Sequence, residues 1–437
     1  MQYIPNVLFA LLLAATTVWF IMQIKKIRRN ILLGRDLDRS DNPGLRWKTM
    51  FMVALGQSKM VKRPVAGLLH IVVYAGFVII NIEVIEILID GLFSTHRVLS
   101  FMGGFYDFLI GSFEILAIGV WTACVIFLIR RNVLKLKRFW QREMTSWPRS
   151  DANIILTTEI LLMTAFLFMN ASDALLQERM VNHYSTAGAF PVSSFLQPLL
   201  DGMTNDSLIF VERFCWWFHI VGVFAFIVYL PISKHFHIML AFPNVYYSNL
   251  EKKGKFSNIE SVTNEVKLMM DPSATPPPAD GAPQTFGAKD IQDLSWKSIM
   301  DGYTCTECGR CSAVCPANQT GKMLSPRKIM MDVRDRAEEV GKNIDKYGKD
   351  HNDGKTLVYD YITPEELWAC TTCNACVEAC PVNNDPLAVI VELRRFLVME
   401  KSEAPKELNN MFTNIENNGA PWQFPMADRL NWAKEQE

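Results

Sequence analysis

The residues best suited to chemistry in this sequence are its cysteines, because eight of the ten form two copies of one pattern, C-x-x-C-x-x-C-x-x-x-C-P. Three closely spaced thiolates can bind three irons of one [4Fe-4S] cubane, while the fourth cysteine of each copy reaches the other cluster. The pattern therefore predicts two clusters. The first is assigned to Cys305, Cys308, Cys311 and Cys380, and the second to Cys370, Cys373, Cys376 and Cys315.

Two other uses of clustered cysteines fit this spacing less well. Zinc also takes four thiolates, but zinc sites usually occur as separated C-x-x-C pairs rather than four cysteines ending in Cys-Pro. Disulfides are disfavoured because the charge pattern described below places these cysteines in the reducing cytoplasm. The remaining Cys124 and Cys215 lie in apolar runs, where we expect buried apolar side chains rather than ligands.

Four of the seven histidines lie in or beside long apolar runs, namely His70, His219, His235 and His237. An imidazole in lipid is costly and normally faces a partner in the protein interior, so each is a candidate functional residue. Haem iron is the partner expected beside iron–sulfur clusters. On an ideal helix the 18 residues from His219 to His237 make five turns, about 27 Å, with both side chains on one face. Pro231 between them can kink such a helix.

The elements that must position these histidines are five apolar runs of about 20 residues, the length that crosses a bilayer. The segments 25–63 and 130–149 are rich in Lys and Arg, whereas the two alternate connections hold one arginine each. By the positive-inside rule the N-terminus lies outside and the C-terminus in the cytoplasm, as in a multi-pass protein of the inner membrane. The runs are 4–24, 65–89, 108–129, 154–171 and 208–230.

Composition divides the chain into a membrane half and a polar half. Half of all residues are hydrophobic, and they concentrate in residues 1–245, which predicts a transmembrane domain. A polar segment with a Pro-rich linker follows at 246–290, then a soluble domain at 291–400 and a tail at 401–437. We expect a mainly α fold in contact with membrane lipid. The formal net charge of −1 argues against a nucleic-acid partner.

The segment between the cysteine motifs predicts a helix over residues 326–340 and a short helical stretch over Pro364–Trp368. With this insert, residues 295–399 resemble the α-helical ferredoxin domain of three proteins. These are the heterodisulfide reductase C-subunit, the anaerobic glycerol-3-phosphate dehydrogenase C-subunit and the succinate dehydrogenase iron–sulfur protein. The resemblance implies that a soluble Cys-Cys-Gly subunit, with or without a flavoprotein, docks on this domain.

The membrane half resembles the cytochrome b, or gamma, subunit of respiratory nitrate reductase, a family with five spans and paired histidines on the second and fifth. This resemblance implies a haem b on His70 and His237 near the cytoplasmic side. The family's second histidine of the second span falls at Ile80, so a second haem on His219 lacks an evident partner. Three alternatives stay open for His219: a second haem shared with a histidine of the outer connections, a hydrogen bond to a quinone, or a core histidine whose hydrogen bonds are satisfied within the protein. The outer histidines are His96 and His183.

Two functional hypotheses follow. The first is a membrane-bound electron-transfer subunit that passes electrons, in a direction left open, between the quinone pool, haem b, the two clusters and a cytoplasmic partner. That partner must supply the other substrate, because the chain holds neither a Gly-rich dinucleotide fingerprint nor a Cys-Cys-Gly motif. The second is a membrane anchor or redox-sensing scaffold without quinone turnover. Four carboxylates inside the spans are candidates for the proton relays that quinone chemistry requires, namely Glu83, Glu86, Glu114 and Glu159.

Overall fold

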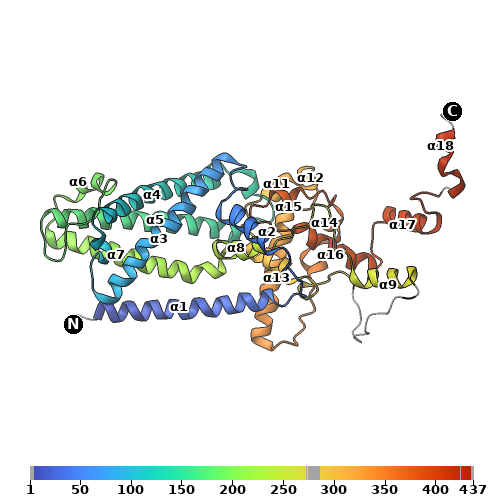
Figure 1. Ribbon diagram of the computed structural model, residues 1–437, viewed down its shortest axis with the longest axis horizontal. Coiled ribbons are helices and arrows are strands. Elements are labelled where there is room, and N and C mark those ends of the chain that lie inside the picture. The colour runs from blue at the N-terminus through green and yellow to red at the C-terminus, as the bar shows by residue number, and fades with distance from the viewer. Residues whose placement is uncertain (1–3, 272, 274–285, 424, 435–437) are drawn as a thin grey trace.

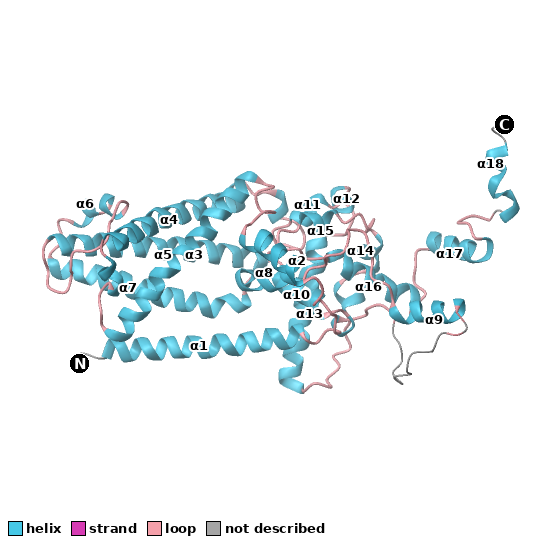
Figure 2. Cartoon of the chain, in the orientation of Figure 1, coloured by secondary structure: helices cyan, strands magenta, loops and turns pink. Residues whose placement is uncertain are grey.

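The computed structural model describes residues 4–271, 273, 286–423 and 425–434. Over these residues the secondary structure is helical and no strand forms, which confirms the mainly α fold class. A bundle of long helices occupies one end of the molecule and a compact domain of shorter helices the other (Figure 1). Loops join the helices in both parts (Figure 2). The prolines of the predicted linker, at 272, 276–278 and 283, lie outside the described residues.

Five helices are long and apolar enough to cross a membrane, as predicted. Each is longer than its apolar run, because the backbone hydrogen bonds continue into the polar flanks. Many of their side chains are more than half exposed, including Leu11, Leu68 and Phe108, as expected where lipid is the surroundings. The chain is therefore a membrane protein. The five helices are α1 (Ile4–Ile31), α3 (Pro64–Phe93), α4 (Gly104–Leu128), α5 (Ser146–Glu178) and α7 (Asn205–Tyr229).

The core of the bundle lies between α3, α4, α5 and α7, and the side chain of Phe9 on α1 closes it. The Phe9 ring lies 5.7 Å from that of Trp216, centroid to centroid. At the end remote from the compact domain, the segment before α6 (Gln197–Leu200) caps the bundle. There the backbone N–H groups of Val192 and Ser193 donate to the Glu114 carboxylate, at 2.8 and 3.0 Å.

The compact domain is built around the long helix α13, together with seven shorter helices. The helix predicted over residues 326–340 extends to Tyr347, and the stretch predicted at Pro364–Trp368 is found as α14. The hydrophobic core of the domain includes Ile27 and Ile31 of α1, so a membrane helix is part of it. The helices are α10 (Trp296–Thr304), α11 (Arg310–Val314), α12 (Pro316–Gln319), α13 (Pro326–Tyr347), α14 (Pro364–Trp368), α15 (Ala375–Ala379), α16 (Pro386–Met399) and, packed beside α10, α8 (His237–Tyr246).

Polar contacts fix the compact domain on the membrane helices. Asn30, near the end of α1, donates from its amide to the Tyr303 hydroxyl at 3.0 Å. Arg35 pairs through its backbone with the carbonyl of Leu294 at 2.7 Å and the N–H of Trp296 at 3.0 Å. The two parts therefore behave as one packed unit. The remaining helices are α2 (Pro43–Met50), α9 (Glu260–Met270), α17 (Lys406–Asn418) and α18 (Asn431–Lys434), of which α17 and α18 project away from the domain (Figure 1).

Arg327 makes the most deeply buried ionic contact between the two parts. Its side chain is fully buried, and it donates to the carboxylate of Glu143 at 2.6 Å and to the carbonyl of Arg138 at 2.6 Å. Both partners belong to the connection between α4 and α5. By contrast, the pair between Lys62 and Glu378, which also joins the two parts, is about half exposed.

We predict that Arg327→Met lowers stability by about 3 kcal/mol, because it leaves the Glu143 carboxylate buried without its partner. Lys62→Met is the control and costs less than about 1 kcal/mol, since exposed ion pairs contribute little. The measurement is the urea midpoint of tryptophan fluorescence for the protein purified in detergent. Equal shifts in the two variants would contradict the assignment of Arg327 as the main ionic contact.

Candidate metal and cofactor centres

The two cysteine motifs have the same backbone conformation as well as the same sequence pattern. Glu307 and Thr372, the residues before the second cysteine of each motif, both have positive φ angles, of 52° and 56°. Gly309 and Asn374, directly after that cysteine, do so too, with φ of 70° and 60°. A short helix follows in each copy, α11 in the first and α15 in the second, and these two helices pack against each other. The sequence repeat is thus a structural repeat.

The fourth cysteine of each motif lies beside the other motif. Burial raises the pKa of the Cys380 thiol to about 12, and the charges of Cys308 and Cys305 add to this effect. Burial also raises the pKa of Cys370, which Cys315 influences in the same direction. Such thiols ionise at neutral pH only when a cation binds them. This proximity is what the predicted exchange of fourth ligands requires.

The arrangement of thiols differs from that of a zinc site. Among the described residues, no three side chains of His, Cys, Asp or Glu are close enough to share one metal ion. The ligands of a cubane each bind a different iron, so they stand further apart than the four ligands of a single ion. The eight cysteines therefore fit two clusters better than mononuclear sites.

All four membrane histidines line one apolar cavity of about 510 Å³, here called the histidine cavity. It extends from the compact domain into the bundle between α3, α5 and α7, and is lined by His70, His219, His235 and His237 together with Ile80, Asn81 and Glu159. The same cavity is lined by Cys308 of the first motif, by Pro381, the last residue of the second motif, and by Val382 directly after it. The candidate haem ligands and the first cluster motif therefore border the same space.

Two of these histidines are oriented as metal ligands usually are. The Nδ1–H of His237 donates to the carbonyl of Lys234 at 3.0 Å, and that of His219 to the carbonyl of Leu162 at 3.0 Å. Since Nδ1 makes this hydrogen bond, the Nε2 of each ring is left free to bind a metal. Histidines that bind metals commonly donate their other ring N–H to a carbonyl or carboxylate in the same way. The Nδ1 of His70 is buried without a hydrogen-bond partner. The donor set and its apolar surroundings fit a haem.

The prediction that His219 and His237 lie on one face assumed a single ideal helix between them. The structure shows that this segment is not one helix. The α-helix ends at Tyr229, two short 3₁₀ turns follow, and α8 begins at His237. Pro231 is the physical reason, because it lacks an N–H donor and its ring clashes with the preceding turn. The break still leaves both histidines lining the same cavity.

The outer histidines lie elsewhere. His96 and His183 have ring centroids 5.2 Å apart and line a second, polar cavity of about 320 Å³ at the far end of the bundle. We call it the distal cavity; His219 is not among its lining residues. The structure thus brings His96 and His183 to each other rather than to His219.

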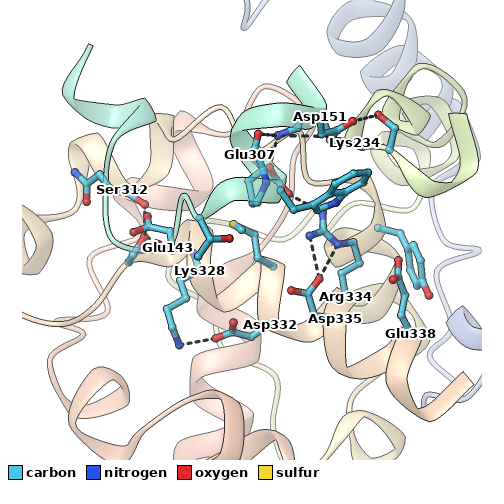
Figure 3. A pocket seen from close by; sticks show the side chains of 18 of the residues that line it. Glu143, Asp151, Lys234, Glu307, Ser312, Lys328, Asp332, Arg334, Asp335 and Glu338 are labelled. Atoms are coloured by element: carbon cyan, nitrogen blue, oxygen red, sulfur yellow. Dashed lines mark hydrogen bonds and ion pairs between the residues drawn. The ribbon is translucent and has the colours of Figure 1, made fainter. Parts of the chain in front are cut away.

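A third cavity, the interdomain cavity, lies between the compact domain and the ends of α1 and α5 and has a volume of about 1460 Å³. Its charged lining is drawn in Figure 3, where Glu307 lies beside Lys234 and Arg334 beside Asp335. Glu307 is buried and pairs with Lys234 and, at 2.8 Å, with Arg334. Burial alone would raise the pKa of Glu307, but these two cations outweigh it and hold the pKa below its usual value.

Comparison with known proteins supports the clusters directly. Residues 297–381 match the family model of the 4Fe-4S dicluster domain. The chain is 28% identical to the probable iron-sulfur-binding oxidoreductase FadF of Bacillus subtilis, over 99% of this chain and 61% of that protein. It is 27% identical to the EtfAB:quinone oxidoreductase of Syntrophomonas wolfei, over 98% of this chain and 59% of that protein. No solved structure matches the chain.

A third relative covers only the cysteine-rich part. It is the C-subunit of the ferredoxin/F(420)H(2)-dependent CoB-CoM heterodisulfide reductase of Methanosarcina acetivorans, 32% identical over 24% of this chain and 53% of that protein. The chain spans about three fifths of the length of the two longer relatives. It carries a dicluster [4Fe-4S] domain joined to membrane helices and is similar to iron–sulfur oxidoreductases that transfer electrons.

Sequence reasoning missed the ion-pair network around Lys234. The Lys234 side chain contacts Glu307 and lies 3.8 Å from the carboxylate of Asp151 at the start of α5. Asp151 also accepts hydrogen bonds from the hydroxyls of Tyr229 at 2.5 Å and Ser233 at 2.6 Å. The one available signal was Glu307, an acidic residue between two ligand cysteines.

The exchange of fourth ligands between motifs predicts the iron content of two double variants. Cys305→Ser with Cys380→Ser removes ligands of one cluster and is expected to retain about half of the wild-type iron. Cys305→Ser with Cys315→Ser removes a ligand from each cluster and is expected to retain much less. Iron analysis and electron paramagnetic resonance of the purified proteins measure both. The reverse order of iron contents would mean that each motif binds its own cluster.

Proposed function

We propose that this protein is a membrane-bound electron-transfer subunit that passes electrons between a quinone, a haem b held by His70 and His237, and two [4Fe-4S] clusters. The observation that carries the proposal is the histidine cavity, which is lined by both histidines and by Cys308. The clusters and the haem, when bound, each exchange one electron at a time, whereas a quinone exchanges two. Cofactors that share one cavity wall lie close enough for direct electron transfer.

The protein's own residues would hold these groups in place and keep water away from them. His237 is fixed by its hydrogen bond to the Lys234 carbonyl, and Lys234 in turn pairs with Glu307 beside the first cluster. The apolar lining of the cavity supplies the dry surroundings that a haem requires. Ile80 offers no ligand in this cavity, which favours a quinone contact over a second haem for His219.

Electrons would leave or enter through the second motif. Cys373 is exposed at the surface of the compact domain, whereas Cys305, Cys315 and Cys376 are buried. A soluble partner docking there, such as a flavoprotein or a Cys-Cys-Gly subunit of the heterodisulfide reductase type, would reach the second cluster. The names of the two long relatives, an iron–sulfur oxidoreductase and an EtfAB:quinone oxidoreductase, support such a partner and a quinone at the other end.

The proposed orientation places the compact domain in the cytoplasm. Its docking surface on the bundle includes Asn30, Arg138 and Glu143, which belong to or adjoin the two Lys- and Arg-rich segments. Basic segments remain on the cytoplasmic side of a membrane. This supports an inner-membrane protein with its N-terminus outside.

The test is a reductive optical titration of the detergent-purified protein and of single histidine variants. His70→Ala and His237→Ala are expected to lose the b-type haem spectrum and keep the resonance signals of both clusters. His96→Ala is the control and keeps the haem, because it lies in the distal cavity. In the wild type, a quinol analogue is expected to reduce the haem.

A wild-type protein with two clusters and no haem would overturn the proposal. That result would favour a membrane anchor or redox-sensing scaffold instead. Loss of haem in His96→Ala together with its retention in His70→Ala would show that the ligands had been assigned to the wrong cavity.

A further inference from the structure

The distal cavity is lined by more carboxylates than cationic side chains, and the proposed electron path uses none of them. It lies at the end of the bundle remote from the compact domain, between α3, α5, α7 and the segments that connect them. Five carboxylates line it, but only two guanidinium groups. The carboxylates are Glu83, Glu86, Asp90, Asp173 and Glu212, and the guanidinium groups are Arg97 and Arg213.

Most of these carboxylates are held by structural hydrogen bonds. Glu86 accepts from the backbone N–H of Leu99 at 2.8 Å and from the hydroxyl of Tyr106 at 2.9 Å. Asp173 accepts from the guanidinium of Arg97 at 2.5 Å. These groups tie the connecting segments to the helices and need no further role.

Glu83 is different, because its side chain is buried and one of its carboxylate oxygens lacks a hydrogen-bond partner. The residue is 4% exposed, and its Oε2 atom has no hydrogen-bond partner. The Nδ1 of His96, whose side chain is 10% exposed, is likewise buried without a partner among the described residues, while the Nε2 of the same ring lies 3.4 Å from the Oδ1 of Asp173. Leaving a buried polar atom without a hydrogen bond is costly, so such atoms usually face water, an ion or a proton. Two of them line this one small cavity.

Glu83 lines the distal cavity at a point of α3 that lies next to residues of the histidine cavity. Ile80 and Val84 line the histidine cavity, whereas Glu86 lines the distal cavity. Along α7 the same change occurs between His219, which lines the histidine cavity, and Trp216, which lines the distal one. The cavities therefore follow each other along the bundle, and Glu83 lies where one gives way to the other.

We propose that the distal cavity is a proton port and that Glu83 carries protons between it and the histidine cavity. The inference rests on the proposed quinone-linked function. Oxidation of a quinol releases two protons with its two electrons, and reduction of a quinone takes up the same numbers. The Glu83 carboxylate accepts one proton at a time, forming an O–H bond that breaks when the proton moves on. Electrons leave toward the compact domain and protons toward the opposite end.

Charges of both signs surround Glu83. The guanidinium of Arg97 attracts the ionised carboxylate, whereas Glu86, Glu114 and Asp173 repel it. Opposite charges favour the ionised form of a carboxyl group and like charges the protonated form, so these neighbours act on Glu83 in opposite directions. The other titratable or charged groups that line the cavity are Asp90, His96, His183, Glu212 and Arg213.

The test uses the full chain, with its cofactors, reconstituted in liposomes that enclose a pH-sensitive dye. Decyl-ubiquinol is oxidised by external ferricyanide, which cannot cross the membrane and takes electrons from molecules whose compact domain faces outward. Protein-free liposomes give the chemical background. In the wild type the lumen is expected to acidify as quinol is oxidised. In Glu83→Gln the rate of quinol oxidation and the rate of acidification of the lumen are both expected to fall at least about tenfold, as when a proton-transfer group is removed.

The control is Asp107→Asn. Asp107 is also a carboxylate at this end of the bundle, but it accepts a hydrogen bond from the backbone N–H of Gly188 at 2.7 Å and lines neither cavity. Its variant is expected to acidify the lumen at the wild-type rate. Two results would contradict the proposed proton port. One is that Glu83→Gln oxidises quinol and acidifies the lumen at the wild-type rates, and the other is that the wild type releases protons only to the outside.

An infrared measurement separates failure of the port from failure of the proposed function. If the wild type does not oxidise quinol above background, the quinone-linked function fails. Infrared difference spectra of the detergent-purified protein between alkaline and acid pH then still report on Glu83. A carboxylic-acid C=O band that Glu83→Gln lacks and Asp107→Asn retains supports exchange of a proton at Glu83. A band unchanged in Glu83→Gln overturns it.

Discussion

The contact between Lys234 and Glu307 is the interaction on which the geometry of the candidate centres depends. Glu307 lies between two cysteines of the first motif, and Lys234 supplies the carbonyl that orients His237. Both side chains are at least nine-tenths buried, and Arg334 shares the carboxylate. Removal of either partner would leave a buried charge unpaired, which is strongly destabilising. One ion pair thus couples the position of a cluster motif to that of a haem-ligand candidate.

The membrane helices and the compact domain are interdependent rather than joined by a flexible tether. Ile27 and Ile31 of α1 belong to the hydrophobic core of the compact domain, and Arg327 of that domain is buried against the connection between α4 and α5. Burial of this kind fixes the cysteines relative to the histidines to within the tolerance of close packing. An electron-transfer path needs such fixed distances more than it needs motion.

The two cavities inside the bundle have opposite chemical character. The histidine cavity is lined mostly by apolar side chains, which suit a haem or a quinone ring, whereas the distal cavity is lined by carboxylates, histidines and arginines. Polar groups inside a bilayer are costly, and those of this bundle gather at the end remote from the compact domain.

The sequence alone determined the elements and the ligand types, because both are encoded locally. Apolar runs of bilayer length set the five spans, and the C-x-x-C-x-x-C-x-x-x-C-P spacing fixed the cluster chemistry now matched by the dicluster family model. Local pattern also predicted α13 and α14. Only the tertiary structure decided how these elements meet. The pairing of His96 with His183 and the position of Glu83 between two cavities follow from packing between residues far apart in the chain, which no local pattern records.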